Sequence, residues 1–251
     1  METTTNWSEL VRHPSQGDHM VHLYQDPAFL AEAVGEYIAS GLRAGEAALI
    51  IATPANRRLF ESKGLRAGPS LRMLDAEETL ARFMSGGQPQ WNAFAEVVGG
   101  LIAELRLQYP AVRAYGEMVD VLWQRGEQDA AVRLEEYWNE LTRLQTFSLL
   151  CAYRIDHLDS EAYRGPLECV CKTHTHLIPT RDYARFNDAV QAASKEVLDQ
   201  PLAQMLLSLS ASHRPATQMP LGQATLLWLS QNMPRTAERV LQKVRLRHAA
   251  V

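Results

Sequence analysis

The chain has 251 residues, of which 46% are hydrophobic and 22% charged, and its formal net charge is -4 at pH 7. This length and balance suit one large globular domain, or one domain with a small appendage. The net charge argues against nucleic-acid binding over the whole surface, and no apolar run reaches the ~18 residues that a membrane span needs.

The N-terminal residues 1–18 read as a polar leader, without the basic and apolar regions of a secretory signal. The chain contains three cysteines, an odd number. An odd count without a secretory signal favours reduced thiols, so we expect a cytoplasmic protein.

Short apolar runs then alternate with amphipathic stretches along the chain. Strands are expected at 20–24, 47–52, 70–74, 111–115 and 147–153, and strand or loop at 168–178. Helices are expected at 27–42, 56–63, 76–84, 90–109, 117–124, 129–144, 180–198, 201–210 and 221–247, with a linker at 215–220. The alternation predicts βαβ units, and hence an α/β fold with a mostly parallel sheet flanked by helices.

The sequence resembles the MEDS family, a sensory domain first described in a dichloromethane-responsive repressor, in five ordered segments: 17–26 (GDHMVHLYQD), 41–53 (GLRAGEAALIIAT), 114–126 (AYGEMVDVLWQRG), 133–141 (RLEEYWNEL) and 148–153 (SLLCAY). The resemblance implies a RecA/KaiC-like domain and a role in sensing simple hydrocarbon derivatives. We therefore expect a sensory domain at 19–180 and a helical C-terminal extension at 181–251.

In KaiC-like relatives a phosphate-binding loop follows the first strand, and here that position holds Tyr24-Gln25-Asp26-Pro27. The chain has no G-x-x-x-x-G-K-[ST] motif, and none of its four lysines lies in the segment directly after this strand. Without glycines the backbone amides cannot wrap phosphates, and Asp26 would repel them. We expect no ATP hydrolysis by the usual mechanism and no cofactor.

In parallel sheets ligands bind outside the carboxyl ends of the strands. We therefore expect a small-molecule pocket there, lined by Tyr24, Thr53, Glu117, Trp123 and Tyr153. Glu117 follows a glycine at a strand end, where a carboxylate can receive a ligand donor. The alternative for Glu117 is an acid at a helix N-terminus, which the helix dipole stabilises.

Candidates from the helix at 129–144 extend this set. Glu135 and Asn139 are four residues apart, so they share one helix face and can bind each other or one partner. Trp138, like Trp123, can line an apolar pocket, but aromatic residues at helical spacing more often pack a core.

Two histidines and a cysteine complete the candidate ligand site. His22 shares one side of the first strand with Tyr24, and His19 lies on the other side. Each imidazole can hold a polar ligand atom or serve only the structure. Cys151 lies within an apolar strand, where inert packing is expected rather than redox chemistry.

A cysteine–histidine cluster is the candidate metal site: Cys169, Cys171, His174 and His176. Zinc accepts two cysteines and two histidines, but the spacing matches neither C-x₂-C nor H-x₃-H. A strand would place the cysteines on one side and the histidines on the other. We therefore expect strand packing or a pocket wall here rather than a metal site.

The basic, apolar-striped helix at 221–247 suggests a surface for a protein partner or a second copy of the chain, or simply a docked helix. Together these features predict a non-catalytic small-molecule sensor that acts in trans on a signalling or transcriptional partner, without direct nucleic-acid or membrane binding. The alternatives are a nucleotide- or metal-binding enzyme derived from a KaiC-like ATPase, and an interaction scaffold without a ligand.

Overall fold

A computed structural model describes residues 7–164, 166–178, 183–212 and 219–249. The chain divides into two compact units, Met1–Arg154 and Ile155–Val251. Within the described ranges, no helix is long and apolar enough to cross a membrane.

The first unit is built on a parallel sheet. Its strands are β1 (His19–Tyr24), β2 (Ala47–Ala52), β3 (Leu71–Asp75), β6 (Val112–Gly116) and β7 (Ser148–Arg154). They are parallel in the order β3-β2-β6-β7-β1. Every residue of β1, β2 and β6 is buried, as in parallel strands that are covered on both faces. The expected α/β fold with a parallel sheet is confirmed.

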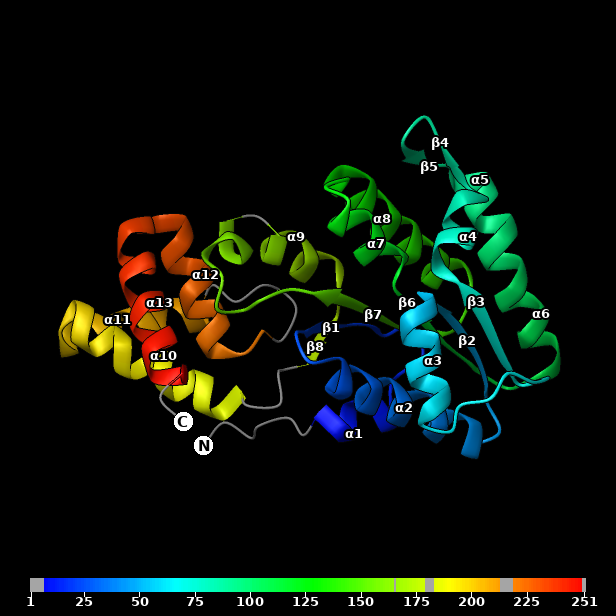
Figure 1. Cartoon of the computed structure of the whole chain (residues 1–251), viewed down its shortest axis with the longest axis horizontal. Coiled ribbons are helices and arrows are strands. Elements are labelled where there is room, and N and C mark those ends of the chain that lie inside the picture. Colours follow the sequence, from blue (N-terminus) through cyan, green and yellow to red (C-terminus); the bar gives the residue numbers. More distant parts are fainter. Residues whose placement is uncertain (1–6, 165, 179–182, 213–218, 250–251) are drawn as a thin grey trace. The chain divides into compact units, whose positions relative to one another are not determined.

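The helices of the first unit cover both faces of this sheet. They are α1 (Trp7–Arg12), α2 (Pro27–Arg43), α3 (Pro54–Ser62), α4 (Ala76–Ala81), α5 (Trp91–Phe94), the π-helical turn η1 (Ala95–Gly99), α6 (Gly100–Gln108), α7 (Met118–Gln124) and α8 (Gln128–Leu144). Right-handed crossovers in this strand order place α2 and α3 on one face and α4 to α8 on the other (Figure 1). A short hairpin of β4 (Met84–Ser85) and β5 (Gln88–Pro89) follows α4.

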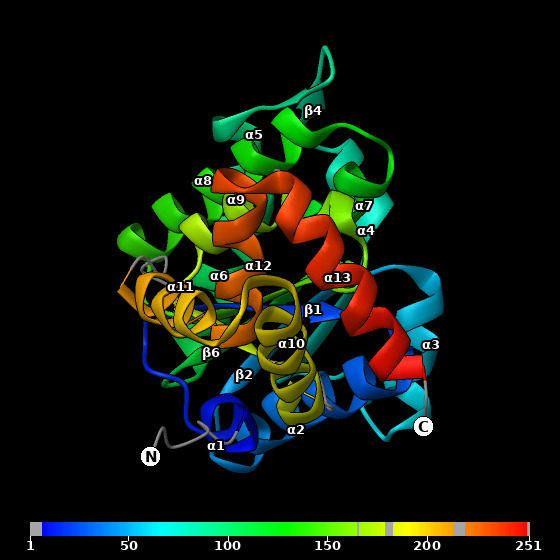
Figure 2. The ribbon, with the colours of Figure 1, turned by 90° about the vertical axis from the view of Figure 1, so that its left-hand side faces the viewer.

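The second unit is mainly helical. Its elements are η2 (Ser160–Arg164), α9 (Pro166–Thr173), β8 (His176–Ile178), α10 (Tyr183–Leu198), α11 (Gln200–Ser212), α12 (Leu221–Asn232) and α13 (Pro234–Ala249). Helix α10 packs against α11, α12 and α13, which form a bundle with it (Figure 2). Gly222 permits a close approach, because a Cβ there would lie 3.3 Å from the Asn187 Cα of α10.

Several expected elements differ from the structure. The strand or loop at 168–178 is wrong for its first part, which is helix α9, because Leu167, Val170 and Cys171 recur at helical spacing and are buried. The single helix at 221–247 is wrong, since Pro234 lacks an amide hydrogen and α12 ends at Asn232. The helix at 76–84 ends at Ala81, before the hairpin.

Some expectations are not tested. Residues 180–182 of the expected helix at 180–198 and most of the linker at 215–220 lie outside the described residues, and so does the start of the leader, whose residues Trp7–Arg12 form α1. The domain limits at 18 and 180 and the kinship with KaiC-like proteins remain predictions.

Candidate functional site

A first polar group, here called the carboxyl-end group, consists of Tyr24, Asn56, Tyr115 and Glu117 near the ends of β1, β2 and β6. The Glu117 carboxylate accepts hydrogen bonds from the Thr53 amide (2.9 Å), the Asn56 side chain (2.8 Å) and the Tyr115 hydroxyl (2.8 Å). Glu117 is only 2% exposed, and burial raises its pKa while these hydrogen bonds oppose the rise. Donors from the chain itself therefore satisfy the hydrogen-bonding capacity of this carboxylate.

Tyr24 and Asp120 extend the same region. Burial is the largest cause that raises the Tyr24 pKa, followed by the charges of Asp120 and Glu117. Asp120 accepts hydrogen bonds from the Gln124 side chain and the Arg154 amide, both at 3.0 Å. These contacts tie the ends of neighbouring strands and α7 together, which is a structural role. Sequence reasoning missed Asn56 and Tyr115; the only signal for Tyr115 is that it lies two residues before Glu117 in the chain.

A second polar group lies on the opposite face of the sheet, under α8. It consists of His19, Glu135, Asn139, Cys151 and Tyr153, and is here called the α8-face group. The register pairs His19 with Leu149, so Leu149, Cys151 and Tyr153 alternate onto the side that His19 occupies. Glu135 and Asn139 reach the group from α8.

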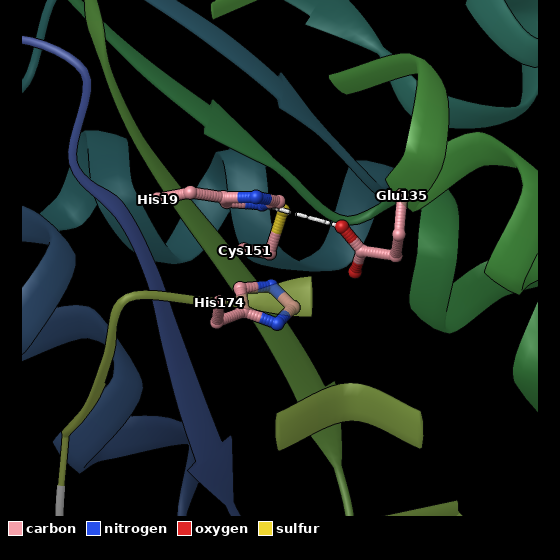
Figure 3. Close-up of side chains that lie close together, drawn as sticks. All are labelled: His19, Glu135, Cys151 and His174. Atoms are coloured by element: carbon pink, nitrogen blue, oxygen red, sulfur yellow. Dashed lines mark hydrogen bonds and ion pairs between the residues drawn. The ribbon is translucent and has the colours of Figure 1, made fainter. Parts of the chain in front are cut away.

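The imidazole of His19 is the centre of the α8-face group. Its Nδ1 lies 3.0 Å from the Asn139 Oδ1, and its Nε2 lies 3.3 Å from the Cys151 Sγ and 3.2 Å from a Glu135 carboxylate oxygen. The other Glu135 oxygen accepts a 2.6 Å hydrogen bond from the Tyr153 hydroxyl. Figure 3 shows His19, Cys151 and Glu135 directed toward one another.

Four members of the α8-face group are buried, since His19, Glu135, Cys151 and Tyr153 are each at most 1% exposed, and Asn139 is half-buried. Burial, and after it the Glu135 carboxylate, raises the pKa of Cys151 and of Tyr153 well above the usual values. Both groups thus keep their protons at neutral pH. The contacts of Cys151, His19 and Asn139 are those of a nucleophile, base and orienting amide, but a protonated thiol is a poor nucleophile.

The family model described as MEDS, MEthanogen/methylotroph, DcmR Sensory domain, matches residues 18–175. The chain belongs to the MEDS family. No curated protein and no solved structure was found to match it. The MEDS range contains both polar groups and every candidate ligand residue predicted from the sequence.

The candidate ligand residues of this MEDS domain divide between the two faces of the sheet. Tyr24, Thr53 and Glu117 belong to the carboxyl-end region, where the Thr53 side chain caps α3. His22 lies on the α2 side of β1, with its ring centroid 5.0 Å from that of Phe29. Five further candidates make up the α8-face group: His19, Glu135, Asn139, Cys151 and Tyr153. Trp123 adjoins it, with its ring 5.9 Å from the Tyr153 ring.

Trp138 lies in the core of the MEDS domain. It is fully buried, and its ring contacts the rings of Phe94 (5.1 Å) and Phe147 (6.3 Å). It also fills the space beside Gly116, where a Cβ would lie 3.5 Å from the Trp138 ring. Within the described residues its indole nitrogen has no hydrogen-bond partner, so the side chain contributes packing only.

We expect Trp138→Phe to lower the free energy of unfolding by about 1–2 kcal/mol, because it leaves a cavity but breaks no hydrogen bond. Urea unfolding measures this loss. In Trp123→Phe, where the ring is half-buried, the loss should stay below about 1 kcal/mol. Equal losses in the two variants would contradict the assignment of Trp138 to the core.

The cysteine–histidine cluster lies in the second unit. Cys171 is buried on α9, His176 begins β8, and the side chain of Cys169 is outside the described part. His174, which Figure 3 also draws, is buried just after α9, with its Nδ1 2.6 Å from the Val170 carbonyl oxygen and 3.0 Å from the Thr173 hydroxyl. Metal binding by these four residues stays a disfavoured prediction.

Proposed function

We propose that this MEDS chain is a non-catalytic sensor that binds a small organic molecule, of the hydrocarbon-derivative class, at the α8-face group. The observation that carries the proposal is a cluster of side chains able to donate, accept or coordinate, drawn from β1, β7 and α8, of which all but Asn139 are buried. Buried polar groups cost free energy unless they are satisfied, and perturbed titratable groups concentrate at functional sites. Apolar side chains would cover the sheet at lower cost.

The position of the group offers a route for a signal. Glu135 and Asn139 belong to α8, whereas His19 and Cys151 belong to the sheet, so a bound molecule would change the contacts that hold α8 on the sheet. Such a molecule shifts the ensemble only if it binds one arrangement better than the other. We propose that the shift is read in trans by a protein partner of a signalling or transcriptional pathway in the cytoplasm.

The turn between β1 and α2 supports a sensor over a nucleotide-dependent enzyme. Only Gln25 and Asp26 connect the two elements, and the Asp26 carboxylate accepts a 2.8 Å hydrogen bond from the Ala28 amide. A carboxylate therefore occupies the helix N-terminus where a phosphate would bind. This geometry favours neither a phosphate loop nor phosphoryl transfer.

A ligand panel tests the proposal. Purified protein is exposed to dichloromethane, methanol and 1-propanol, and melting temperature and native mass are recorded. We expect at least one compound to raise the melting temperature. In Glu135→Gln the apparent affinity for that compound, taken from the concentration dependence of the rise, should be about tenfold or more weaker. The exposed-carboxylate control Glu104→Gln should respond like the wild type, because Glu104 is 53% exposed on α6.

Two outcomes would count against the proposed site. Loss of the response in Glu117→Gln, with a normal response in Glu135→Gln, would place the ligand at the carboxyl-end group instead. A wild-type protein that responds to none of the compounds would favour an interaction scaffold.

A further inference from the structure

We propose that His19, Glu135 and Cys151 form a binding site for a divalent transition metal ion of borderline softness, with Zn²⁺ as the reference case. The inference concerns the same side chains as the proposed sensor site, but it does not require that an organic molecule binds. Three different ligand types converge here within one unit of the fold (Figure 3).

The separations of the three ligand atoms match a tetrahedral ion. The His19 Nε2 lies 3.2 Å from the Glu135 Oε2 and 3.3 Å from the Cys151 Sγ, and the sulfur lies 3.8 Å from that oxygen. Zinc bonds of about 2.0 Å to nitrogen and oxygen and about 2.3 Å to sulfur, in tetrahedral geometry, separate the ligand atoms by about 3.3–3.5 Å. Shifts of a few tenths of an ångström would complete the site.

The surrounding side chains orient the ligands as they do in metalloproteins. The His19 Nδ1 lies 3.0 Å from the Asn139 Oδ1, and in the tautomer with the proton on Nδ1 the lone pair of Nε2 is directed toward the other two ligands. The Tyr153 hydroxyl donates to the Glu135 Oε1, and Oε2 is the oxygen that faces the His19 Nε2 and the Cys151 Sγ. Hydrogen bonds of this kind fix the tautomer and the ring orientation of metal-binding histidines.

The charges also balance. A divalent ion that displaces the Cys151 thiol proton to solvent binds one thiolate, one carboxylate and a neutral imidazole, so the site becomes neutral overall. Overall neutrality matters here because the three ligand side chains are each at most 1% exposed, and an uncompensated buried charge costs free energy. Calcium and magnesium prefer oxygen ligands, so the nitrogen and sulfur atoms select zinc, cobalt or a similar ion.

Three ligands leave one position of a tetrahedron for a donor from outside the trio. Zinc sites with three protein ligands bind water or a substrate at that position. A small molecule with an oxygen or sulfur atom can occupy it, which would join the metal site to the proposed sensing role.

Cobalt titration of the chelator-treated full chain tests the site, because Co²⁺ bound to thiolate gives a near-ultraviolet charge-transfer band. We expect one equivalent of Co²⁺ to produce the band, and Zn²⁺ to displace it. Cys151→Ser should abolish the band. His19→Ala and Glu135→Gln should weaken the apparent affinity about 10-fold or more, and Asn139→Leu about 10–100-fold by loss of ligand orientation.

Cys171→Ser is the matched control, since Cys171 is also buried and in no disulfide within the described residues, and its replacement should leave the band unchanged. Circular dichroism confirms that each variant is folded. Absence of the band in the wild type, or its persistence in folded Cys151→Ser, would overturn the metal site. A cobalt band without any organic response refutes the sensor alone, and an organic response in metal-free protein without a band refutes the metal site alone.

Discussion

Replacement of Arg113 by alanine should lower the free energy of unfolding by about 3–5 kcal/mol, because it removes the buried guanidinium of an ion pair and of several hydrogen bonds. Arg113 lies on β6 and is 4% exposed. Its guanidinium donates to the Glu46 carboxylate at 2.6 Å and also to the Ser40 hydroxyl. It donates further to three backbone carbonyls, those of Val11, Arg12 and Tyr37. The variant leaves these acceptors and a carboxylate without their donor.

Urea unfolding of the alanine variant, measured beside Arg72→Ala, tests this expectation. Arg72 is 42% exposed and forms a 3.5 Å ion pair with Glu104, so its loss should cost no more than about 1 kcal/mol. Arg113→Lys should fall between the two, since an ammonium cannot fork to several acceptors. Similar small losses in both alanine variants would show that water replaces the Arg113 contacts.

The sheet could be predicted because each strand is a local apolar pattern. The expected strand at 47–52 coincides with β2, and the expected strand at 147–153 is displaced by one residue from β7. Because these strands alternate with helices along the chain, the parallel arrangement of the sheet could also be predicted. Arg113 shows the limit, because its strand was expected but its burial depends on partners from α1 and α2. Gly41 belongs to the same arrangement, since a Cβ there would lie 2.5 Å from the Arg113 Nε.

All residues of the α8-face group, and Tyr24 and Glu117 of the carboxyl-end group, could be selected from the sequence, but their grouping could not. Helical spacing placed Glu135 and Asn139 on one face, and both contact His19. However, Asn139 lies 120 positions from His19, and Cys151 lies 132 positions from it. Such contacts depend on the register between β1 and β7, and a one-residue slip would reverse the faces. The expectation that ligands bind at the carboxyl ends of the strands pointed to Glu117. Its carboxylate instead accepts hydrogen bonds from Thr53 and Asn56 of the same chain.

Acidification should destabilise the protein through His22. The ring is fully buried on β1, and within the described part of the chain neither nitrogen has a hydrogen-bond partner. Burial lowers the pKa of His22 to about 3. In the unfolded chain the imidazole has a pKa of about 6.5, so between these values the unfolded state binds a proton that the folded state excludes.

This difference in proton binding determines how the free energy of unfolding changes with pH. Stability from the buried neutral ring is complete above the unfolded pKa and is lost as the pH falls toward the folded value. The loss approaches about 1.4 kcal/mol per pH unit, or on the order of 3 kcal/mol between pH 7 and pH 4.5. The buried carboxyls act in the opposite direction, because burial raises the pKa values of Glu117 and Asp120. Their folded forms take up protons first and gain stability as the pH falls.

A comparison of wild type with His22→Leu separates these opposing contributions, because the carboxyls are common to both proteins. Leucine retains apolar contact with Phe29 and has no proton to bind. Between pH 7 and pH 4.5 the free energy of unfolding of the variant should rise relative to that of the wild type by about 3 kcal/mol. The exposed control His13→Gln should follow the wild-type curve. Parallel curves for wild type and His22→Leu would mean that a proton reaches the folded ring, and hence that β1 and α2 separate readily enough to admit water.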